Sequence, residues 1–514
     1  MSGTSENNKR IAKNTMLLYF RMIFIMIISI FTSRINLQSL GVENFGIYNV
    51  VGGVVAMFSV FSGSLGVSIS RFITFELGKE NKERLQKVFS TAVSIQMLLA
   101  VGITILAEIV GIWFLNNKMN IPEERLDAAN WVMHLSIITF AVNLISVPYN
   151  AAIIAHEKMS AFAYVSVFEV VAKLGITYYL FISPFDKLKT FAVLLFVLSI
   201  ILRLIYGIYC KRHFQECSYK FVLDKELLKN MGGFAGWTMF GNLSWVGYTY
   251  GTNLMLNLFF GPIVNAARGI AVQVENAIKG FVSNFQMALN PQIIKTYANE
   301  ELGKMHTLLY ASSRYSFFLL LILTLPVIIE TDYILSLWLE TVPKHTANFI
   351  RLTLCIMMVD ALANPLMVAV QATGRIKLYQ AVVGGIQLLI VPFSYLVLKI
   401  ESYPEVVLIV HLIMAVIAQI ARITMIRTMI NLSLRKYFIE VVMRIVSVVC
   451  LSIFLPIALY YFLPQNSLCS FFVISVVCVI SVLCSIYWGG LSKYERQFIL
   501  NEIIRRFHVT IVVK

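Results

Sequence analysis

The stretch LGVENFGIYN at residues 40–49 has a looser counterpart in FGPIVNAARG at residues 260–269, 220 positions further along the chain. At the same offset, LGKENKERL at 77–85 matches YANEELGKM at 297–305. In the first half of the chain, 40–49 lies just before a long apolar run and 77–85 just after it. In the second half, 260–269 and 297–305 lie in the same way before and after another long apolar run. The sequence therefore indicates an internal repeat.

A third similarity lies later in each repeat. VNLISVPYNAAIIAHEK at 142–158 matches VDALANPLMVAVQATGR at 359–375, at an offset of 217, and this aligns Pro148 with Pro365. Each repeat contains six apolar runs, an even number, so both repeats have the same orientation in a membrane. Transporters built from such repeats bind substrate where the repeats meet. The alternative is that the duplicated helices serve only as a scaffold.

The composition identifies the class of protein. Apolar residues make up 58% of the 514 residues and charged residues 13%, with a mean hydropathy of +0.78. A soluble protein carries about a quarter charged residues. At about 20 residues per membrane span, the apolar residues fill roughly fourteen helices. The chain is therefore predicted to be a polytopic membrane protein without a large soluble catalytic domain.

Apolar windows predict fourteen spans in an all-α fold, arranged as two six-helix bundles and two further C-terminal helices. The predicted spans are 14–36, 45–70, 88–115, 127–155, 162–182, 190–211, 230–259, 263–291, 312–335, 347–371, 377–398, 405–427, 439–462 and 468–489. The predicted domains are an N-terminal lobe at 1–212, a linker at 213–229, a C-terminal lobe at 230–430, and helices 13 and 14 with an amphipathic tail at 431–514.

The basic residues predict the orientation. With the N-terminus inside, inner segments hold 26 Lys and Arg and outer loops hold 7, and the other 9 of the 42 lie within or beside spans. Basic residues are retained on the cytoplasmic side, so both termini are predicted to be cytoplasmic. The two longest inner loops, at 71–87 and 211–229, are predicted to be either short amphipathic helices on the membrane surface or plain solvated connectors.

Several ionisable residues fall inside predicted spans, where each costs about 2.5–3.5 kcal/mol to insert. They are Arg21, Glu108, Glu169, Lys173, Arg203, Arg268, Glu275, Lys279 and Asp360. Glu169 with Lys173, and Glu275 with Lys279, have the i, i+4 spacing that allows an ion pair along one helix. These pairs are either structural or opened when an anion or a proton competes for one partner. Arg314, Arg351, Arg422 and Arg444 are predicted to extend to the membrane surface without a functional role.

Arg21 has no acidic residue within helical reach, because nothing between Lys13 and Glu43 is acidic. Its partner must come from another helix. Arg268 lies near the outer end of its span, seven residues before Glu275 on the same helix face. One basic residue in each repeat would suit an anion that passes between the repeats, and Lys173 and Arg203 would extend this path.

Other function classes lack a signature. The net charge of +15 comes from basic residues between apolar runs, which does not fit a nucleic-acid surface. The seven cysteines show no CxxC pair or metal-ligand spacing. We find no nucleotide-binding loop, zinc-protease motif or nucleophile elbow. Any uphill transport would therefore use an ion gradient, of protons or sodium, or the membrane potential.

The fourteen predicted spans, the LGVENFGIYN stretch, the SRFITFELGKENKERL run at 70–85 and the NPQIIKTYANEE run at 290–301 resemble the polysaccharide flippases of the multidrug/oligosaccharidyl-lipid/polysaccharide exporter superfamily. The resemblance covers almost the whole chain. It implies a V-shaped pair of six-helix bundles around a cationic cavity, with alternating access. It also implies transport of undecaprenyl-pyrophosphate-linked oligosaccharide repeat units across the bacterial inner membrane, for O-antigen or capsule assembly.

Under this resemblance, the cations of the cavity fall on Arg21 and Arg268, joined by Lys173, Lys279 and Arg203 as substrate-binding residues. Glu169, Glu275 and Asp360 are the candidates for taking up a coupling ion. The expected partners are the lipid-linked oligosaccharide, the phospholipid bilayer and polysaccharide polymerase and glycosyltransferase enzymes, with no nucleic acid, and the protein is expected to be a monomer. The alternatives are a lipid II flippase, an ion-coupled multidrug antiporter, or a membrane glycan polymerase or ligase, although such an enzyme typically has a long outer loop with catalytic residues.

Overall fold

The computed structural model describes residues 2–56, 58–118, 121–220, 224–339, 342–464, 467–493 and 495–497. This part of the chain is almost entirely helical and contains no strand, which confirms the predicted all-α membrane class. The predicted amphipathic tail beyond residue 497 lies outside the described residues.

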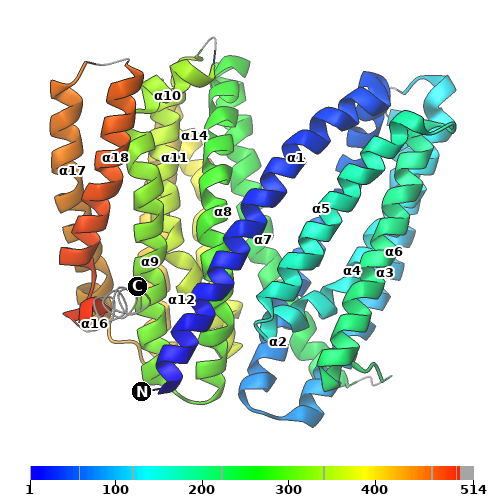
Figure 1. The fold of residues 1–514 in the computed structure, drawn as a ribbon, viewed down its shortest axis with the longest axis horizontal. Helices are drawn as coiled ribbons and strands as arrows, with labels where there is room; N and C mark the ends of the chain where they lie inside the picture. The colour runs from blue at the N-terminus through cyan, green and yellow to red at the C-terminus, as the bar shows by residue number, and fades with distance from the viewer. Residues whose placement is uncertain are drawn as a thin grey trace, which may run out of the picture. The chain divides into compact units, whose positions relative to one another are not determined.

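Six long helices and one short turn of helix make up the first repeat (Figure 1). They are α1 (Ser2–Ala56), α2 (Ser59–Gly78), α3 (Lys82–Lys118), α4 (Glu123–Ala155), α5 (Met159–Ile182), α6 (Lys187–His213) and η1 (Gln215–Cys217).

The rest of the chain has more breaks in its helices. Its elements are α7 (Lys225–Phe260), α8 (Pro262–Ala298), α9 (Leu302–Ile329), α10 (Thr331–Trp338), α11 (Thr346–Ala361), α12 (Ala363–Thr373), α13 (Lys377–Leu388), α14 (Ile390–Leu398), α15 (Glu405–Ile430), α16 (Leu434–Tyr437), η2 (Phe438–Met443), α17 (Arg444–Phe462), α18 (Leu468–Ser485) and η3 (Ile486–Gly490).

The chain forms two compact units. Unit 1 comprises Met1–Leu243, Met287–Glu301 and Gln371–Ala381, and unit 2 comprises Ser244–Gln286, Leu302–Val370 and Val382–Lys514. In unit 1, α4 packs against α2, α3 and α6, around a core that includes Phe89 and Ile153. In unit 2, α11 packs against α9 and α15, and α17 and α18 lie side by side. Unit 1 therefore also contains the first part of α7, the last part of α8 and the turn between α12 and α13.

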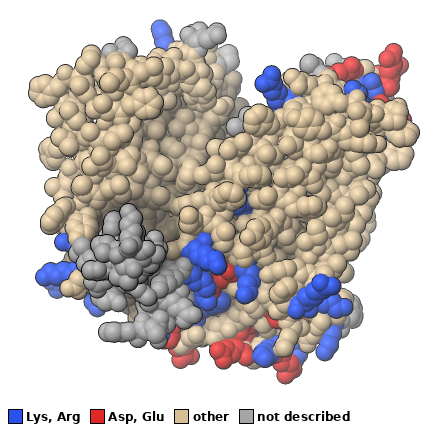
Figure 2. All heavy atoms as spheres, viewed as in Figure 1, with Lys and Arg blue, Asp and Glu red and all other residues tan. Residues whose placement is uncertain are grey.

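The lipid-facing surface is apolar. Met16, Phe20 and Phe31 project from α1 as exposed side chains, which suits acyl chains rather than water. On the face drawn in Figure 2, Lys and Arg side chains gather toward the helix ends, and the surface between them is largely uncharged. The face drawn in Figure 2 therefore presents the apolar band that a bilayer requires.

Eleven helices in the described part of the chain are long and apolar enough to cross a membrane. The predicted spans at 45–70, 230–259 and 263–291 are not among them. α7 and α8 are nevertheless continuous helices of 36 and 37 residues. α7 is rich in Gly, Asn and Thr, and α8 carries Arg, Glu and Lys, which lowers their hydropathy without interrupting the helix. The number fourteen therefore stays a prediction.

The backbone confirms the internal repeat. Each of the three sequence matches aligns two residues that both have positive φ, at a turn between helices. The pairs are Gly41 with Gly261 (both φ 78°), Glu80 with Glu300 (φ 55° and 62°), and Glu157 with Gly374 (φ 59° and 75°). Positive φ is uncommon outside glycine, so three matched pairs indicate the same turn geometry in both repeats.

The predicted amphipathic helix at 71–87 is wrong. α2 continues to Gly78 and α3 begins at Lys82, so only a tight turn remains between them. Arg71, predicted to lie in the loop, is a buried residue of α2 and donates hydrogen bonds inside unit 1, as described below. In the second loop, η1 is held by the buried Glu216, whose Oε1 lies 2.5 Å from His156 Nε2. No separate surface helix forms among the described residues of either loop.

Gly41 has a conformation that only glycine adopts readily. Its φ of 78° and ψ of 163° bend the chain within α1. We expect Gly41→Ala to destabilise the protein by about 1–3 kcal/mol, because a Cβ strains this backbone. Thermal unfolding in detergent measures the effect. Gly46→Ala is the control, since Gly46 is helical with open space around it, and should be neutral or slightly stabilising. Equal unfolding temperatures for the two variants would contradict the assignment.

Candidate functional site

Arg21 on α1 lies at the centre of a charged cluster in unit 1. Its guanidinium carbon is 4.5 Å from the centroid of the Phe162 ring. It interacts electrostatically with Tyr206 of α6 and Glu169 of α5, so its acidic partner does come from another helix. Its Nε is buried and has no hydrogen-bond partner among the described residues. A buried donor without a partner is costly.

Glu169 is shared between cations. Lys173 Nζ donates to Glu169 Oε1 at 2.6 Å, along one turn of α5. Arg203 lies on α6, with its guanidinium carbon 3.9 Å from the centroid of the Tyr149 ring. The structure thus places Arg21, Lys173 and Glu169 in one cluster and Arg203 one turn of α6 from Tyr206. With two cations and one acid, the cluster of Arg21, Lys173 and Glu169 has an excess of positive charge.

Arg268 on α8 is buried in unit 2. Its Nη1 donates to Thr353 Oγ1 at 2.8 Å, and it interacts electrostatically with Glu275 and Tyr248. Its Nε, like that of Arg21, has no partner among the described residues. The predicted pair between Glu275 and Lys279 is loose, with 3.9 Å between Oε1 and Nζ. Lys279 remains exposed.

Asp360 on α11 has a cationic neighbour that sequence reasoning missed. Arg422 of α15 was predicted to extend to the membrane surface, and this is wrong: its side chain is buried. Arg422 Nη1 donates to Gln419 Oε1 at 3.3 Å, and Arg422 interacts electrostatically with Asp360, as does Lys279. Asp360 has no basic residue one turn away on α11. This lack of a local partner was the sequence signal that its cation would come from another helix.

Arg314 on α9 was also predicted to extend to the surface, and it too is buried. Its Nη2 donates to Glu495 at 2.7 Å, and Tyr315 Oη donates to the same oxygen at 2.7 Å. Glu440 of η2 lies 3.8 Å from Arg314 and 2.7 Å from Arg444. Burial raises the pKa of Glu495, but the Ser492 amide and the Arg314 charge outweigh it, and the pKa is lowered overall. This network fixes the last two helices to α9.

Arg71 on α2 is a buried cation that contacts the end of another helix, α12. Its Nε and Nη2 donate to the carbonyl oxygens of Gln371 and Ala372, both at 2.9 Å. These carbonyls belong to the last turn of α12, where no intrahelical donor is available. The guanidinium also lies over the rings of Phe72 and Phe75, at 4.6 and 4.7 Å. Arg71 was predicted to lie in a loop, and its contact with α12 was not predicted.

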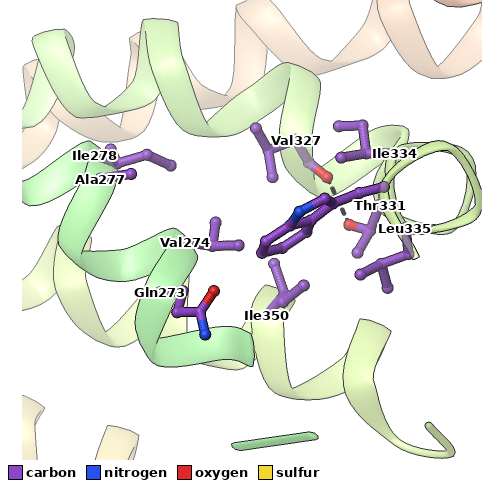
Figure 3. Close-up of a pocket in the computed structure, with 10 residues that line it drawn as sticks. Gln273, Val274, Ala277, Ile278, Val327, Thr331, Ile334, Leu335 and Ile350 are labelled. Carbon is purple, nitrogen blue, oxygen red and sulfur yellow. Dashed lines mark hydrogen bonds between the residues drawn. The ribbon is translucent and has the colours of Figure 1, made fainter. Parts of the chain in front are cut away.

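A cavity of about 360 Å³ lies in unit 2 between α8, α10 and α11 (Figure 3). It is lined by Gln273, Val274, Ala277, Ile278, Val327, Thr331, Ile334, Leu335, Trp338 and Ile350. No charged side chain lines it, and the Thr331 hydroxyl is occupied by the Val327 carbonyl. The cavity therefore suits an apolar group such as an isoprenoid or acyl segment, and not an anion.

The sequence matches a family model described as polysaccharide biosynthesis protein over residues 11–297, more than half of the chain. The chain belongs to the polysaccharide biosynthesis protein family. The family match runs from α1 to α8 and so contains Arg21, Glu169 and Lys173 of unit 1 and Arg268 and Glu275 of unit 2. Asp360 and Arg422 lie beyond it. No curated protein sequence matches this chain at a significant level.

Solved transporters share the fold of this polysaccharide biosynthesis protein. A mutant of the MATE transporter VcmN from Vibrio cholerae is 15% identical, with a TM-score of 0.70 over 85% of this chain and 100% of that one. An outward-facing multidrug resistance MATE family transporter of the MOP superfamily is 15% identical, with a TM-score of 0.69 over 83% and 96%. At these identities the likeness shows the fold alone: that of MATE transporters of the MOP superfamily.

A third solved structure concerns the sign of a binding pocket. It is a MOP superfamily transporter from Pyrococcus furiosus, whose title states that reverse polarity of its binding pocket suggests a different function. It is 16% identical to this family member, with a TM-score of 0.66 over 82% of this chain and 96% of that one. The present chain is therefore a multi-pass membrane protein with a transporter fold.

Proposed function

We propose that this protein is a flippase that moves undecaprenyl-pyrophosphate-linked oligosaccharide repeat units across the bacterial inner membrane by alternating access, for O-antigen or capsular polysaccharide assembly. The observation that carries the proposal is the sign of the unit 1 cluster. Arg21 and Lys173 outnumber Glu169, and α1 has no acid between Lys13 and Glu43. A positive site favours an anionic cargo over a cationic drug, and the family description supports a polysaccharide pathway.

The cations would bind the pyrophosphate group. The Arg21 guanidinium and the Lys173 ammonium offer charge-assisted hydrogen bonds to phosphate oxygens. In unit 2, Arg268 and Lys279 would bind the phosphates or acidic sugars. The apolar cavity beside α8 would accept an isoprenoid segment. The excess of basic residues in the predicted inner segments supports cytoplasmic termini. The bacterial inner membrane is the location that goes with the proposed substrate.

In this proposal, ion coupling depends on Glu169, the acid that interacts with both Lys173 and Arg21. When phosphate binds Lys173, Glu169 loses its 2.6 Å hydrogen bond and retains only its electrostatic interaction with Arg21, so its carboxylate is left with less compensating charge. A proton or a sodium ion would then neutralise it. Glu275, already loosely held, and Asp360 would act in the same way in unit 2. In this scheme the protein needs no bound cofactor and works as a monomer in the bilayer, receiving its substrate from glycosyltransferases and passing it to a polymerase.

The test is reconstitution into liposomes with a labelled polyprenyl-pyrophosphate oligosaccharide. Arg21→Ala and Arg268→Ala are each expected to slow flipping about 10- to 100-fold, because a hydrogen bond to a charged group contributes about 1.5–3 kcal/mol. Lys189→Ala is the control, since Lys189 pairs with Asp127 at an exposed helix end. Equal flipping by wild type and both variants would refute the site. Drug efflux without glycan movement would favour the multidrug antiporter.

A further inference from the structure

The carboxylate of Glu157 is the most heavily bonded acid at the end of unit 1 where α1 begins. Its side chain is 2% exposed. It accepts hydrogen bonds from Gln292 Nε2 at 2.6 Å and Lys295 Nζ at 2.7 Å, and Arg10 Nε lies 3.1 Å away. Asn14 Nδ2 donates to the Glu157 backbone carbonyl at 3.2 Å. Two cations and two amides therefore converge on one residue.

These groups join the two repeats. Glu157 follows α4, and Arg10 and Asn14 lie on α1, all in the first repeat, whereas Gln292 and Lys295 lie on α8 of the second. All belong to unit 1. Directly beside them lies a small core of three side chains with no exposed surface: Leu18, Met159 and Ala288. The Glu157 contacts therefore seal an apolar layer at this end of the unit.

The repeat supplies a second contact at the equivalent place. Gly374, which aligns with Glu157, follows α12 of the second repeat, and it lies beside the Arg71 guanidinium of the first repeat. A Cβ on Gly374 would be 3.0 Å from Arg71 Nη2. Each repeat thus holds the end of a helix from the other, but only the Glu157 contact places an anion among cations.

The cations are more accessible than the anion they hold. The Arg10 side chain is 50% exposed and that of Lys295 is 25% exposed, against 2% for Glu157. An anion arriving from outside therefore meets Arg10 and Lys295 first. Carboxylate and phosphate oxygens accept the same hydrogen bonds from guanidinium and ammonium groups, so a diphosphate group has the chemistry to replace the carboxylate.

We propose that Arg10, Gln292 and Lys295 form a diphosphate-binding site whose resident anion is Glu157, and that the head group of the lipid-linked substrate displaces Glu157 and opens this end of unit 1. The inference rests on the proposed function, because it takes its ligand from the proposed substrate. It adds an entry site distinct from the Arg21 cluster. Separating the repeats without a substrate would leave Glu157 and its cations unpaired, so under this proposal the seal opens only when a substrate arrives.

The experiment follows the accessibility of the sealed layer. Ala288→Cys is introduced into a variant that lacks the seven native cysteines, and its reaction with a charged maleimide is timed in lipid nanodiscs. We expect slow labelling with Glu157 present and at least tenfold faster labelling with Glu157→Gln. Inorganic pyrophosphate and polyprenyl pyrophosphate should both accelerate labelling when Glu157 is present, whereas neutral polyprenol should not. Neither diphosphate should accelerate the labelling of the Glu157→Gln protein further.

Glu216→Gln is the matched control. Glu216 is also a buried carboxylate near this end, but its partner His156 belongs to the same repeat, so labelling should stay slow. Lys295→Gln tests the same seal from the other repeat and should label fast, which keeps the test decisive if Glu157→Gln folds poorly. Slow labelling of both Glu157→Gln and Lys295→Gln would overturn the proposal, as would a lack of response to both diphosphates. A response to inorganic pyrophosphate alone would overturn the lipid-linked ligand.

The outcome also separates this inference from the proposed function. If the labelling pattern holds but no glycan is flipped by the wild type, the flippase assignment fails and the diphosphate site stands. If glycan flipping depends on Arg21 while labelling ignores Glu157, the flippase assignment stands and this entry site fails.

Discussion

Replacing Arg71 with leucine is expected to destabilise the protein by about 3–5 kcal/mol. The substitution removes two hydrogen bonds from a buried guanidinium to the last carbonyls of α12. Hydrogen bonds to charged groups contribute about 1.5–3 kcal/mol each, and a cation at a helix C-terminus adds a favourable interaction with the helix dipole. Thermal unfolding of the purified protein in detergent measures the loss.

Two further variants show what causes the effect. Arg71→Lys keeps the charge but cannot donate in the same two directions, so it should recover only part of the stability. Lys87→Leu removes an exposed cation that pairs with Glu83 along one turn of α3, and such pairs contribute about 0.3–0.5 kcal/mol. A loss in Arg71→Leu no larger than that in Lys87→Leu would show that the α12 contact is unimportant.

Replacing Arg314 with methionine is expected to cost about as much, 3–5 kcal/mol, because removing one member of a buried ion pair leaves the other unpaired. The variant leaves Glu495, 2.7 Å from Arg314 Nη2, without its principal cation. Unfolding in detergent again measures the loss. Arg351→Met is the control, since Arg351 pairs with Asp332, which is 66% exposed. An equally large loss in that control would contradict the assignment.

The same pair sets a pH dependence. The pKa of Glu495 is lowered in the folded protein, so its contribution to stability is present above the pKa of a free Glu, about 4.3. It is lost as the pH falls through the lower, folded-state pKa. Arg314→Met removes part of this dependence, so wild type and variant should differ most near neutral pH and converge in acid.

The helices could be predicted from the sequence because a membrane imposes one strong pattern. Every predicted span lies on helix, including α7 and α8, whose polar residues keep them below the hydropathy of the others, although some spans, such as 45–70 and 312–335, cross a break between two helices. The turns were harder, because a bend such as that at Gly41 depends on two backbone angles and not on hydropathy. Only the repeat, which aligns Gly41 with Gly261, carried that information.

The candidate site was predictable where its contacts are local. Glu169 and Lys173 are four residues apart, and helix geometry brings them together. Contacts between distant helices have no such signature: Lys295 and Glu157 are 138 positions apart, and Arg71 and Gln371 are 300. Hydropathy places Arg314 and Arg422 near the ends of predicted spans, but does not show which way they point. Their burial follows from acceptors that only the fold brings near.

The π-helical segments η2 and η3 have a consequence for how the last helix pair is joined to the bundle. Each segment widens one turn, as a single inserted residue does in an α-helix. Glu440 of η2 lies 2.7 Å from Arg444, and the Gly490 carbonyl at the end of η3 accepts from Arg314 at 3.3 Å. Deleting one residue from either segment would rotate the adjoining turn by about 100°, so chain length at these two places governs whether the pair stays attached.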